Sequence, residues 1–211
     1  MKNKSHTIAF LAVMFTCIFV AMMLDKGISS ALPISTAFCS LLITFSFCFL
    51  TNNYLVGFLS GVFFGLASCL KELFFPSLIT TNLVSIGKWY IIPVQYLVPR
   101  LAVGIFAFAV YKVVLFLMRN AKSIYLRQTV SISIASFFGL LANTILFLSI
   151  LVFSNAQANT PTTLVAVLQS VVIVNILPEY LITILLAPHV VLNVRKAMRW
   201  GLECNLSRED F

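Results

Sequence analysis

Two long stretches without a charged residue constrain how this chain can fold. They cover residues 27–70 and 128–178, which are 44 and 51 residues long. About 20 apolar residues in a helix cross a bilayer, so each stretch is too long for one helix. Polar segments divide them at residues 51–53 and 154–161. The pattern predicts pairs of membrane-spanning helices and, over the whole chain, an all-α membrane protein.

The composition excludes a soluble globular domain, since 61% of the residues are hydrophobic and only 9% are charged. The 211 residues have room for about six spans with short connections, so we expect one transmembrane domain over residues 1–211. The first apolar run is expected to stay in place rather than to be a cleaved signal, and Asp25–Gly27 is expected to end it. The predicted spans are residues 7–24, 33–50, 54–70, 93–118, 128–153 and 163–190.

The lysines and arginines predict the orientation of these spans. With both termini in the cytoplasm, ten of these residues fall on the cytoplasmic side and three on the outer side. Cytoplasmic loops are enriched in positive charge, so the distribution favours this N-in, C-in arrangement. The outer residues are Lys26, Lys71 and Lys88, and the inner ones are Lys2, Lys4, Lys112, Arg119, Lys122, Arg127, Arg195, Lys196, Arg199 and Arg208.

Arg100 and Glu179 are charged residues inside stretches that otherwise have the character of spans, and each directly follows a proline. A charge at bilayer depth is costly, so it normally faces a partner or a polar cavity. The proline removes a helix hydrogen bond and frees a carbonyl one turn earlier. Two interpretations stay open: an ion pair that joins the fourth and sixth spans, or a substrate site. Because Glu179 lies deeper than Arg100, we expect Arg100 to contact ligand and Glu179 to orient the floor of the site.

Polar and aromatic residues near these two charges complete the predicted site. Gln95, Tyr96 and Asn175 lie about one helical turn before a charge, and Asn143 lies deep in the fifth span. Lys88, Trp89 and Tyr90 end a loop that is expected at residues 74–91. The aromatic and cationic end of that loop suits the covering of a small organic ligand, although Trp89 equally suits an anchor at the membrane interface. The candidate substrate-binding residues are Arg100, Asn143, Asn175, Glu179, Gln95, Tyr96, Lys88, Trp89 and Tyr90.

Small residues recur at four-residue spacing in two spans. Gly57, Gly61 and Gly65 do so in the third span, where such a stripe lets a neighbouring backbone approach closely. We expect the stripe to pack against another helix of the same chain. Ala12 and Thr16 form a similar face in the first span, which either packs within the chain or docks an external helix.

Catalytic and metal-binding motifs are weak in this sequence. Ser60–Gly61 and His189 are components of an intramembrane serine protease, but Phe58 stands where that signature requires glycine. The two histidines are far apart, no phosphate-binding loop is found, and the five cysteines fit small packing residues better than disulfides or metal ligands. We therefore expect no enzyme activity, cofactor or metal. Uphill transport would need an ion gradient, with Glu179 as a proton carrier, or ATPases of other subunits.

Three stretches give the chain a resemblance to the substrate-binding S components of energy-coupling factor (ECF) vitamin transporters. Residues 54–72 resemble the glycine-rich third helix of that family, and LVPRLAVGIFAFAVY at residues 97–111 resembles the fourth helix with its proline–arginine start. GLLANTILF at residues 139–147, with NILPE at residues 175–179, resembles the fifth and sixth helices. The likeness follows the chain in order over most of its length.

The resemblance implies a function and partners. An S component of the bacterial plasma membrane binds a vitamin from outside, in a pocket built by its last three helices. It then associates with a transmembrane T component and two cytoplasmic ATPases and releases the vitamin inward. In that family the first helix docks the T component, which implies this role for Ala9, Ala12 and Thr16, although the family's usual pair of alanines is not intact here.

The proline–arginine start of the fourth span is most similar to the pantothenate-type members of the family. The carboxylate of pantothenate would bind Arg100 or Lys88 through charge-assisted hydrogen bonds. Its hydroxyls and amide would then meet Asn143, Asn175 and Gln95. Cobalamin, folate and pyrimidine- or pyridoxine-type vitamins are alternative ligands, and a self-sufficient ion-coupled transporter is the alternative from a different class.

Overall fold

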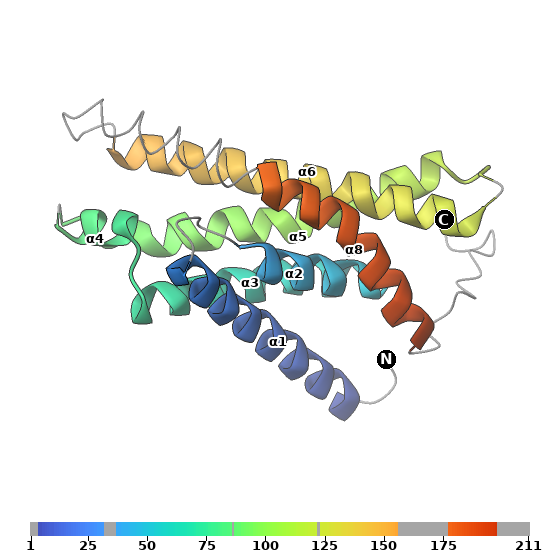
Figure 1. The fold of residues 1–211 in the computed structure, drawn as a ribbon, viewed down its shortest axis with the longest axis horizontal. Coiled ribbons are helices and arrows are strands. Elements are labelled where there is room, and N and C mark those ends of the chain that lie inside the picture. The colour runs from blue at the N-terminus through green and yellow to red at the C-terminus, as the bar shows by residue number, and fades with distance from the viewer. Residues whose placement is uncertain (1–3, 32–36, 86, 122, 156–176, 198–211) are drawn as a thin grey trace.

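The structure, a computed structural model, describes residues 4–31, 37–85, 87–121, 123–155 and 177–197 (Figure 1). All regular structure within these ranges is α-helical. Five of the described helices are long and apolar enough to cross a membrane, so the described part of the chain is all-α and of the multi-pass membrane type. The helices are α1 (Lys4–Ala31), α2 (Phe38–Leu50), α3 (Tyr54–Phe74), α4 (Leu78–Ser85), α5 (Ile91–Leu117), α6 (Ile124–Asn155) and α8 (Leu177–Ala197).

Six spans stay a prediction. The helix at the predicted second span, α2, has 13 residues and is about 20 Å long, which is shorter than a bilayer core. Residues 163–176 of the predicted sixth span lie outside the described residues.

The prediction that Asp25–Gly27 ends the first helix is wrong, because α1 continues to Ala31. The carboxylate of Asp25 is compensated inside the protein rather than by water. Its Oδ1 accepts a hydrogen bond from Cys39 N at 3.0 Å, and its Oδ2 accepts one from Ser40 N at 2.8 Å. An acid that is bonded in this way can stay in a continuous helix.

Two further helices continue past the end of a predicted span, and the charged residues there again have partners inside the protein. α3 continues past residue 70 to Phe74, because Lys71 and Glu72 neutralise each other at 3.1 Å, and the loop expected at residues 74–91 contains α4. The last helix continues past residue 190 to Ala197, because the side chain of Arg195 is bonded to protein groups inside the bundle.

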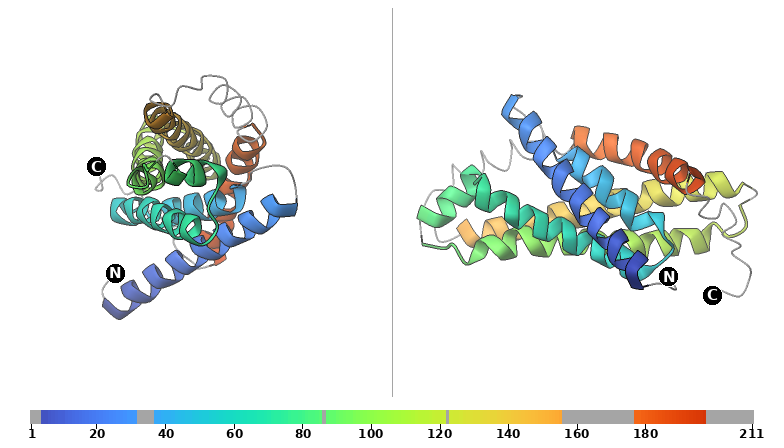
Figure 2. Two further views of the ribbon diagram at one scale, coloured as in Figure 1. Left: turned by 90° about the vertical axis from the view of Figure 1, so that its left-hand side faces the viewer. Right: turned by 90° about the horizontal axis from the view of Figure 1, so that it is seen from below.

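The helices form an elongated bundle in which α5 lies between α3 and α6 (Figure 1). α1 crosses α2 and α3 obliquely, as all three views show (Figure 2). α4 lies at one end of the bundle, which we call the α4 end. The start of α1, the α2–α3 and α5–α6 connections and the last turn of α8 lie toward the opposite end (Figure 1).

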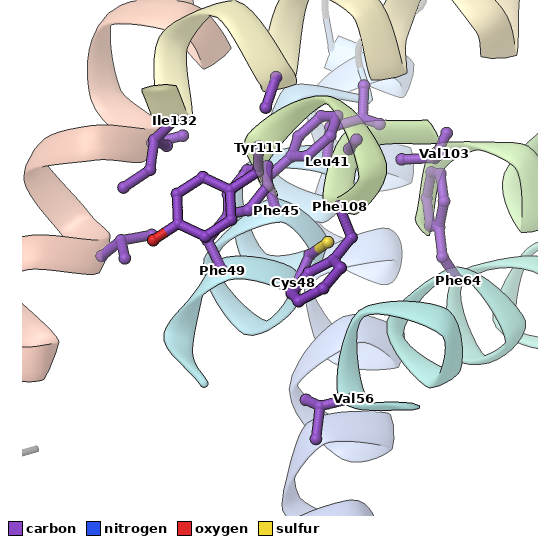
Figure 3. Packing of buried hydrophobic residues seen from close by; sticks show 14 of the residues in the cluster. Leu41, Phe45, Cys48, Phe49, Val56, Phe64, Val103, Phe108, Tyr111 and Ile132 are labelled. Carbon is purple, nitrogen blue, oxygen red and sulfur yellow. The ribbon is translucent and has the colours of Figure 1, made fainter. Parts of the chain in front are cut away.

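The centre of the bundle is an aromatic core (Figure 3). Phe45 and Phe49 of α2 stack with their ring centroids 5.9 Å apart, and the Tyr111 ring lies 5.2 Å from that of Phe49. Phe108 continues the cluster at 6.1 Å from Tyr111. α2 is short but is held on several sides by these contacts, because α1, α3, α5 and α8 all pack against it.

The glycine stripe of α3 packs against α5. A Cβ atom on Gly61 would lie 2.8 Å from the carbonyl oxygen of Arg100 and 3.0 Å from Gly104 N. A Cβ atom on Gly57 would meet the ring of Phe108, and one on Gly65 would meet Leu97. The two backbones therefore touch at Gly61 and Gly104, and this contact fixes the height of Arg100 against α3.

Charged side chains hold both ends of α2. Asp25 binds the free amides at its first turn, as described above. At its other end, Nε of Arg195 donates to Leu50 O at 3.2 Å and Nη2 donates to Phe49 O. Nη2 also donates to the hydroxyl of Tyr111 at 3.2 Å. A negative charge at the N-terminus of a helix and a positive one at its C-terminus complement the helix dipole, so α1 and α8 both stabilise α2.

Candidate functional site

Arg100 lies on α5, and its guanidinium is surrounded by three aromatic rings. The central carbon of the group is 5.0 Å from the ring centroid of Tyr96, 5.6 Å from that of Phe64 and 5.7 Å from that of Phe147. The rings come from α5, α3 and α6, so three helices build the surroundings of one cation. Their π faces attract the positive charge in a place where water does not solvate it fully.

Pro99 explains why the guanidinium lies where it does. A proline inside a helix has no N–H, so the carbonyl four residues earlier loses its normal donor. That carbonyl belongs to Gln95, and Nη1 of Arg100 donates to it at 3.4 Å. The proline–arginine pair thus supplies both an unpaired carbonyl and the cation that binds it.

Three of the residues predicted for the site, on α5 and α6, have a buried polar atom without a hydrogen-bond partner: Nε of Arg100, Oε1 of Gln95 and Oδ1 of Asn143. Gln95 is fully buried, and its Nε2 donates to Phe147 O at 3.3 Å. Asn143 precedes Phe147 by one turn of α6 and therefore shares its helix face. Buried polar groups nearly always have partners, so one donor and two acceptors left over at the α5–α6 contact are the features of a site that binds something.

A polar network adjoins the rings of Tyr96, Phe64 and Phe147 around Arg100, which we call the Arg100 cage. Oε2 of Glu72 accepts hydrogen bonds from Ser77 N at 2.9 Å and from Thr80 Oγ1 at 2.6 Å. Its Oε1 lies 3.1 Å from Lys71 Nζ. The hydroxyl of Tyr96 completes the network, at 2.9 Å from Ser77 Oγ and 3.2 Å from Thr80 Oγ1. Tyr96 thus belongs to both groups, with its ring beside Arg100 and its hydroxyl among the partners of Glu72.

Glu72, Ser77 and Thr80 were not among the residues predicted for the site. A signal for Glu72 was present, because Glu72 follows Gly65 by seven residues and so lies on the glycine face of α3. A charge on a face that packs against another helix is expected to be buried, and Glu72 is 3% exposed.

Glu179 lies in the first turn of α8, and Arg100 and Glu179, both described, form no ion pair with each other. Next to Glu179, the hydroxyl of Tyr180 is 2.8 Å from Thr144 Oγ1 of α6.

Two of the loop residues predicted for the site are largely exposed. The side chains of Trp89 and Tyr90 are 67% and 60% exposed and meet each other edge to face. This exposure fits the alternative role of Trp89 as an interfacial anchor. Lys88 is partly buried, and Asn175 lies outside the described residues.

The predicted docking face of α1 is open in the structure. Ala9, Ala12 and Thr16 are all exposed, and Thr16 Oγ1 donates to the Ala12 carbonyl at 2.9 Å. The hydroxyl is therefore turned back onto its own helix.

Ser60 and His189, the two residues considered for a serine protease, lie in different surroundings. Ser60 is buried, and its hydroxyl donates to Gly57 O at 2.7 Å, whereas His189 is exposed on α8. Among the described residues, no group of three or more histidine, cysteine, aspartate or glutamate side chains has the arrangement of a metal site.

Comparison with known proteins gives no match: no family model, no curated protein and no solved structure is similar to this chain. Function is therefore inferred from the residues themselves.

Proposed function

We propose that this chain is a membrane subunit that binds a small carboxylate-bearing vitamin, with pantothenate as the leading candidate, and that it serves as the S component of an ECF-type transporter. The observation that supports this proposal is the Arg100 cage. One caged cation with an unpartnered N–H lies at the α5–α6 contact, where Gln95 and Asn143 each contribute an unpartnered buried carbonyl.

The chemistry of these groups selects the ligand class. Rings surround the guanidinium and its Nη1 donates to Gln95 O, so the unpartnered Nε–H is the donor that we propose for a planar carboxylate. Arginine binds carboxylates in this manner through charge-assisted hydrogen bonds. The carbonyl oxygens of Gln95 and Asn143 accept hydrogen bonds, so the same ligand needs hydroxyl or amide N–H groups. Pantothenate has a carboxylate, two hydroxyls and an amide.

The proposed membrane arrangement follows the positive-inside rule, with both termini in the cytoplasm and the α4 end facing outward. The Arg100 cage then lies in the outer half of the bundle, where a ligand arrives from outside. The plasma membrane of a bacterium is the proposed location. A T component would dock on the exposed small-residue face of α1, and two ATPases would supply the energy.

A titration of the purified chain in nanodiscs tests the proposal. Isothermal calorimetry with pantothenate is expected to give a saturable signal that Arg100→Met weakens at least about tenfold, since a hydrogen bond to a charged group contributes roughly 1.5–3 kcal/mol. Arg119→Ala is the control, because Arg119 is an exposed arginine at the opposite end of α5. Equal affinity of the wild type and Arg100→Met for pantothenate would refute the role of Arg100.

Native mass spectrometry identifies the vitamin independently. A protein purified from cells grown in rich medium is expected to retain a carboxylate-bearing compound, and cobalamin, folate or a pyridoxine-type vitamin in its place would correct the ligand. Copurification of a T component and two ATPases would support the S-component assignment.

Glu179 favours a second candidate, a self-sufficient ion-coupled transporter. It is an acid inside a membrane-spanning helix, and Thr183, one turn later, has a buried hydroxyl without a partner. Such a pair is a starting point for a proton or cation pathway. Uptake by the isolated chain in liposomes, driven by a proton gradient alone, would establish this function and exclude the first.

A further inference from the structure

Glu72 connects α4 to the Arg100 cage through an unbroken series of contacts. Its Oε2 accepts from two groups in and just before the first turn of α4, Ser77 N and Thr80 Oγ1. Both of these residues lie within hydrogen-bond distance of the Tyr96 hydroxyl, and the Tyr96 ring is the closest of the three rings to Arg100. Four side chains thus link a surface helix to a buried cation.

This series of contacts holds the start of α4. The helix has eight residues and packs mainly against α5. Leu83 anchors its later part, since that side chain is 1% exposed. A carboxylate at the N-terminus of a helix also complements the helix dipole. The position of the first turn of α4 therefore depends on Glu72.

We propose that Glu72 is a positioning residue for the Arg100 site, and that through Thr80, Ser77 and Tyr96 it makes the order of α4 depend on Arg100. This regulation of the site rests on the proposed function for its biological meaning. The physical coupling is a property of the protein without ligand. When a ligand binds Arg100 and orders the Tyr96 ring, α4 is held more firmly at the end from which the ligand entered.

Two substitutions of Glu72 separate position from charge. Both hydrogen bonds to α4 go to a single oxygen, so the carbonyl of Glu72→Gln can still accept them, and only the charge and the contact with Lys71 are lost. Glu72→Ala loses all of these contacts. A positioning role predicts that the glutamine variant resembles the wild type, whereas a purely electrostatic role predicts that both variants behave alike.

Amide hydrogen exchange of the full-length chain in nanodiscs, without ligand, tests the coupling. For peptides that cover residues 77–85 we expect Glu72→Ala to exchange roughly tenfold faster than the wild type and Glu72→Gln to stay within about twofold. Tyr96→Phe removes only the hydroxyl that touches Ser77 and Thr80, and it should also accelerate exchange. Unchanged exchange in peptides of α6 confirms that each variant is folded.

The decisive measurement is a double-mutant cycle between Arg100 and Tyr96. Arg100→Ala should accelerate exchange of α4 by roughly threefold in the wild-type background and have no further effect in Tyr96→Phe, because the path is already broken. Glu179→Gln is the control acid and should leave α4 unchanged. Unaltered α4 exchange in Arg100→Ala would overturn the coupling, and equal exchange in Glu72→Gln and Glu72→Ala would overturn the positioning role.

These outcomes are independent of the ligand. If pantothenate does not bind but Arg100→Ala still loosens α4, the inference holds and the ligand is wrong. If pantothenate binds through Arg100 while α4 exchange is the same in every variant, the proposed function holds and the inference is wrong.

Discussion

Arg195 and Arg100 are two arginines inside membrane-spanning helices, and they differ in how many hydrogen bonds their guanidinium groups make. Arg195 is 4% exposed, and its guanidinium donates to two carbonyls at the end of α2 and to the Tyr111 hydroxyl. Arg100 has one hydrogen bond, at 3.4 Å, three rings around it and an unpartnered Nε. A cation whose donors are satisfied by the fold stabilises the fold, whereas a cation with spare capacity is available to a ligand.

The acidic residues Asp25, Glu72 and Glu179 also differ in whether their carboxylates have partners inside the protein. Both oxygens of Asp25 and both of Glu72 are bonded to other groups of the protein. Asp25 binds the first turn of α2, and Glu72 binds the start of α4. Glu179 is a charge that the described contacts do not explain, and this is why it is kept as a candidate for ion coupling.

Arg195→Met is expected to have the largest effect on stability. It leaves the last carbonyls of α2 without donors and should lower the free energy of unfolding by about 3 kcal/mol or more. Reversible unfolding in mixed detergent micelles measures this value. Lys196→Met is the matched control, because Lys196 is exposed on the next position of α8. Equal stability of the two variants would show that the α2 cap contributes nothing.

Gly61→Ala should have the second largest effect, because it forces a methyl group to within 2.8 Å of the Arg100 carbonyl. Overpacking of this kind costs about 1–3 kcal/mol. The displacement of α5 should also weaken ligand binding, which would show that the Arg100 site depends on the α3–α5 contact. Gly27→Ala is the control, since a Cβ atom at Gly27 meets nothing within 4 Å. That variant should be as stable as the wild type or slightly more stable.

Asp25→Ala removes the cap at the other end of α2 and should cost about 1–2 kcal/mol in the unfolding experiment. The loss should be smaller than that of Arg195→Met, because the freed amides of Cys39 and Ser40 lie at a less deeply packed end. An increase in stability on this substitution would contradict the account of α2 as a helix held by two charges.

Arg100→Met should have the smallest effect on stability and the largest on binding. Replacing a poorly paired buried cation with an apolar chain of similar length is often neutral or stabilising. The expected change in unfolding free energy is within about 1 kcal/mol of zero, and this contrast with Arg195→Met is the sharpest test of the comparison. A loss as large as that of Arg195→Met would make Arg100 a structural residue.

The sequence supports the outline of the fold because that outline depends on local pattern. Apolar runs predicted membrane helices, and the proline before Arg100 predicted a freed carbonyl, which the structure places at Gln95. The errors come from contacts between distant residues. Asp25 was expected to end a helix, and nothing near it in the chain shows that it binds amides of α2.

The same limit applies to the polar network at α4. Ser77 and Thr80 have the composition of a loop, and only the position of Glu72 beside them gives them a helical role. Arg195 lies 145 residues from the carbonyl of Leu50 to which it donates. The spacing of residues within one helix predicts a packing face, such as the glycine stripe of α3, but it does not predict which helix that face contacts.

The backbone contact between Gly61 and Gly104 also has a mechanical consequence. The backbones meet directly at this point, and the side chains of Phe108 and Leu97 fill the space on either side of it, so we expect α3 and α5 to move as one rigid body. Glu72, Tyr96 and Arg100 all lie on this body and keep their relative positions during any working cycle. Rearrangement would then occur at its borders, where α1, α2 and α6 pack. On the proposed transport function, a covalent crosslink between α3 and α5 should leave transport intact, whereas one between α1 and α3 should arrest it.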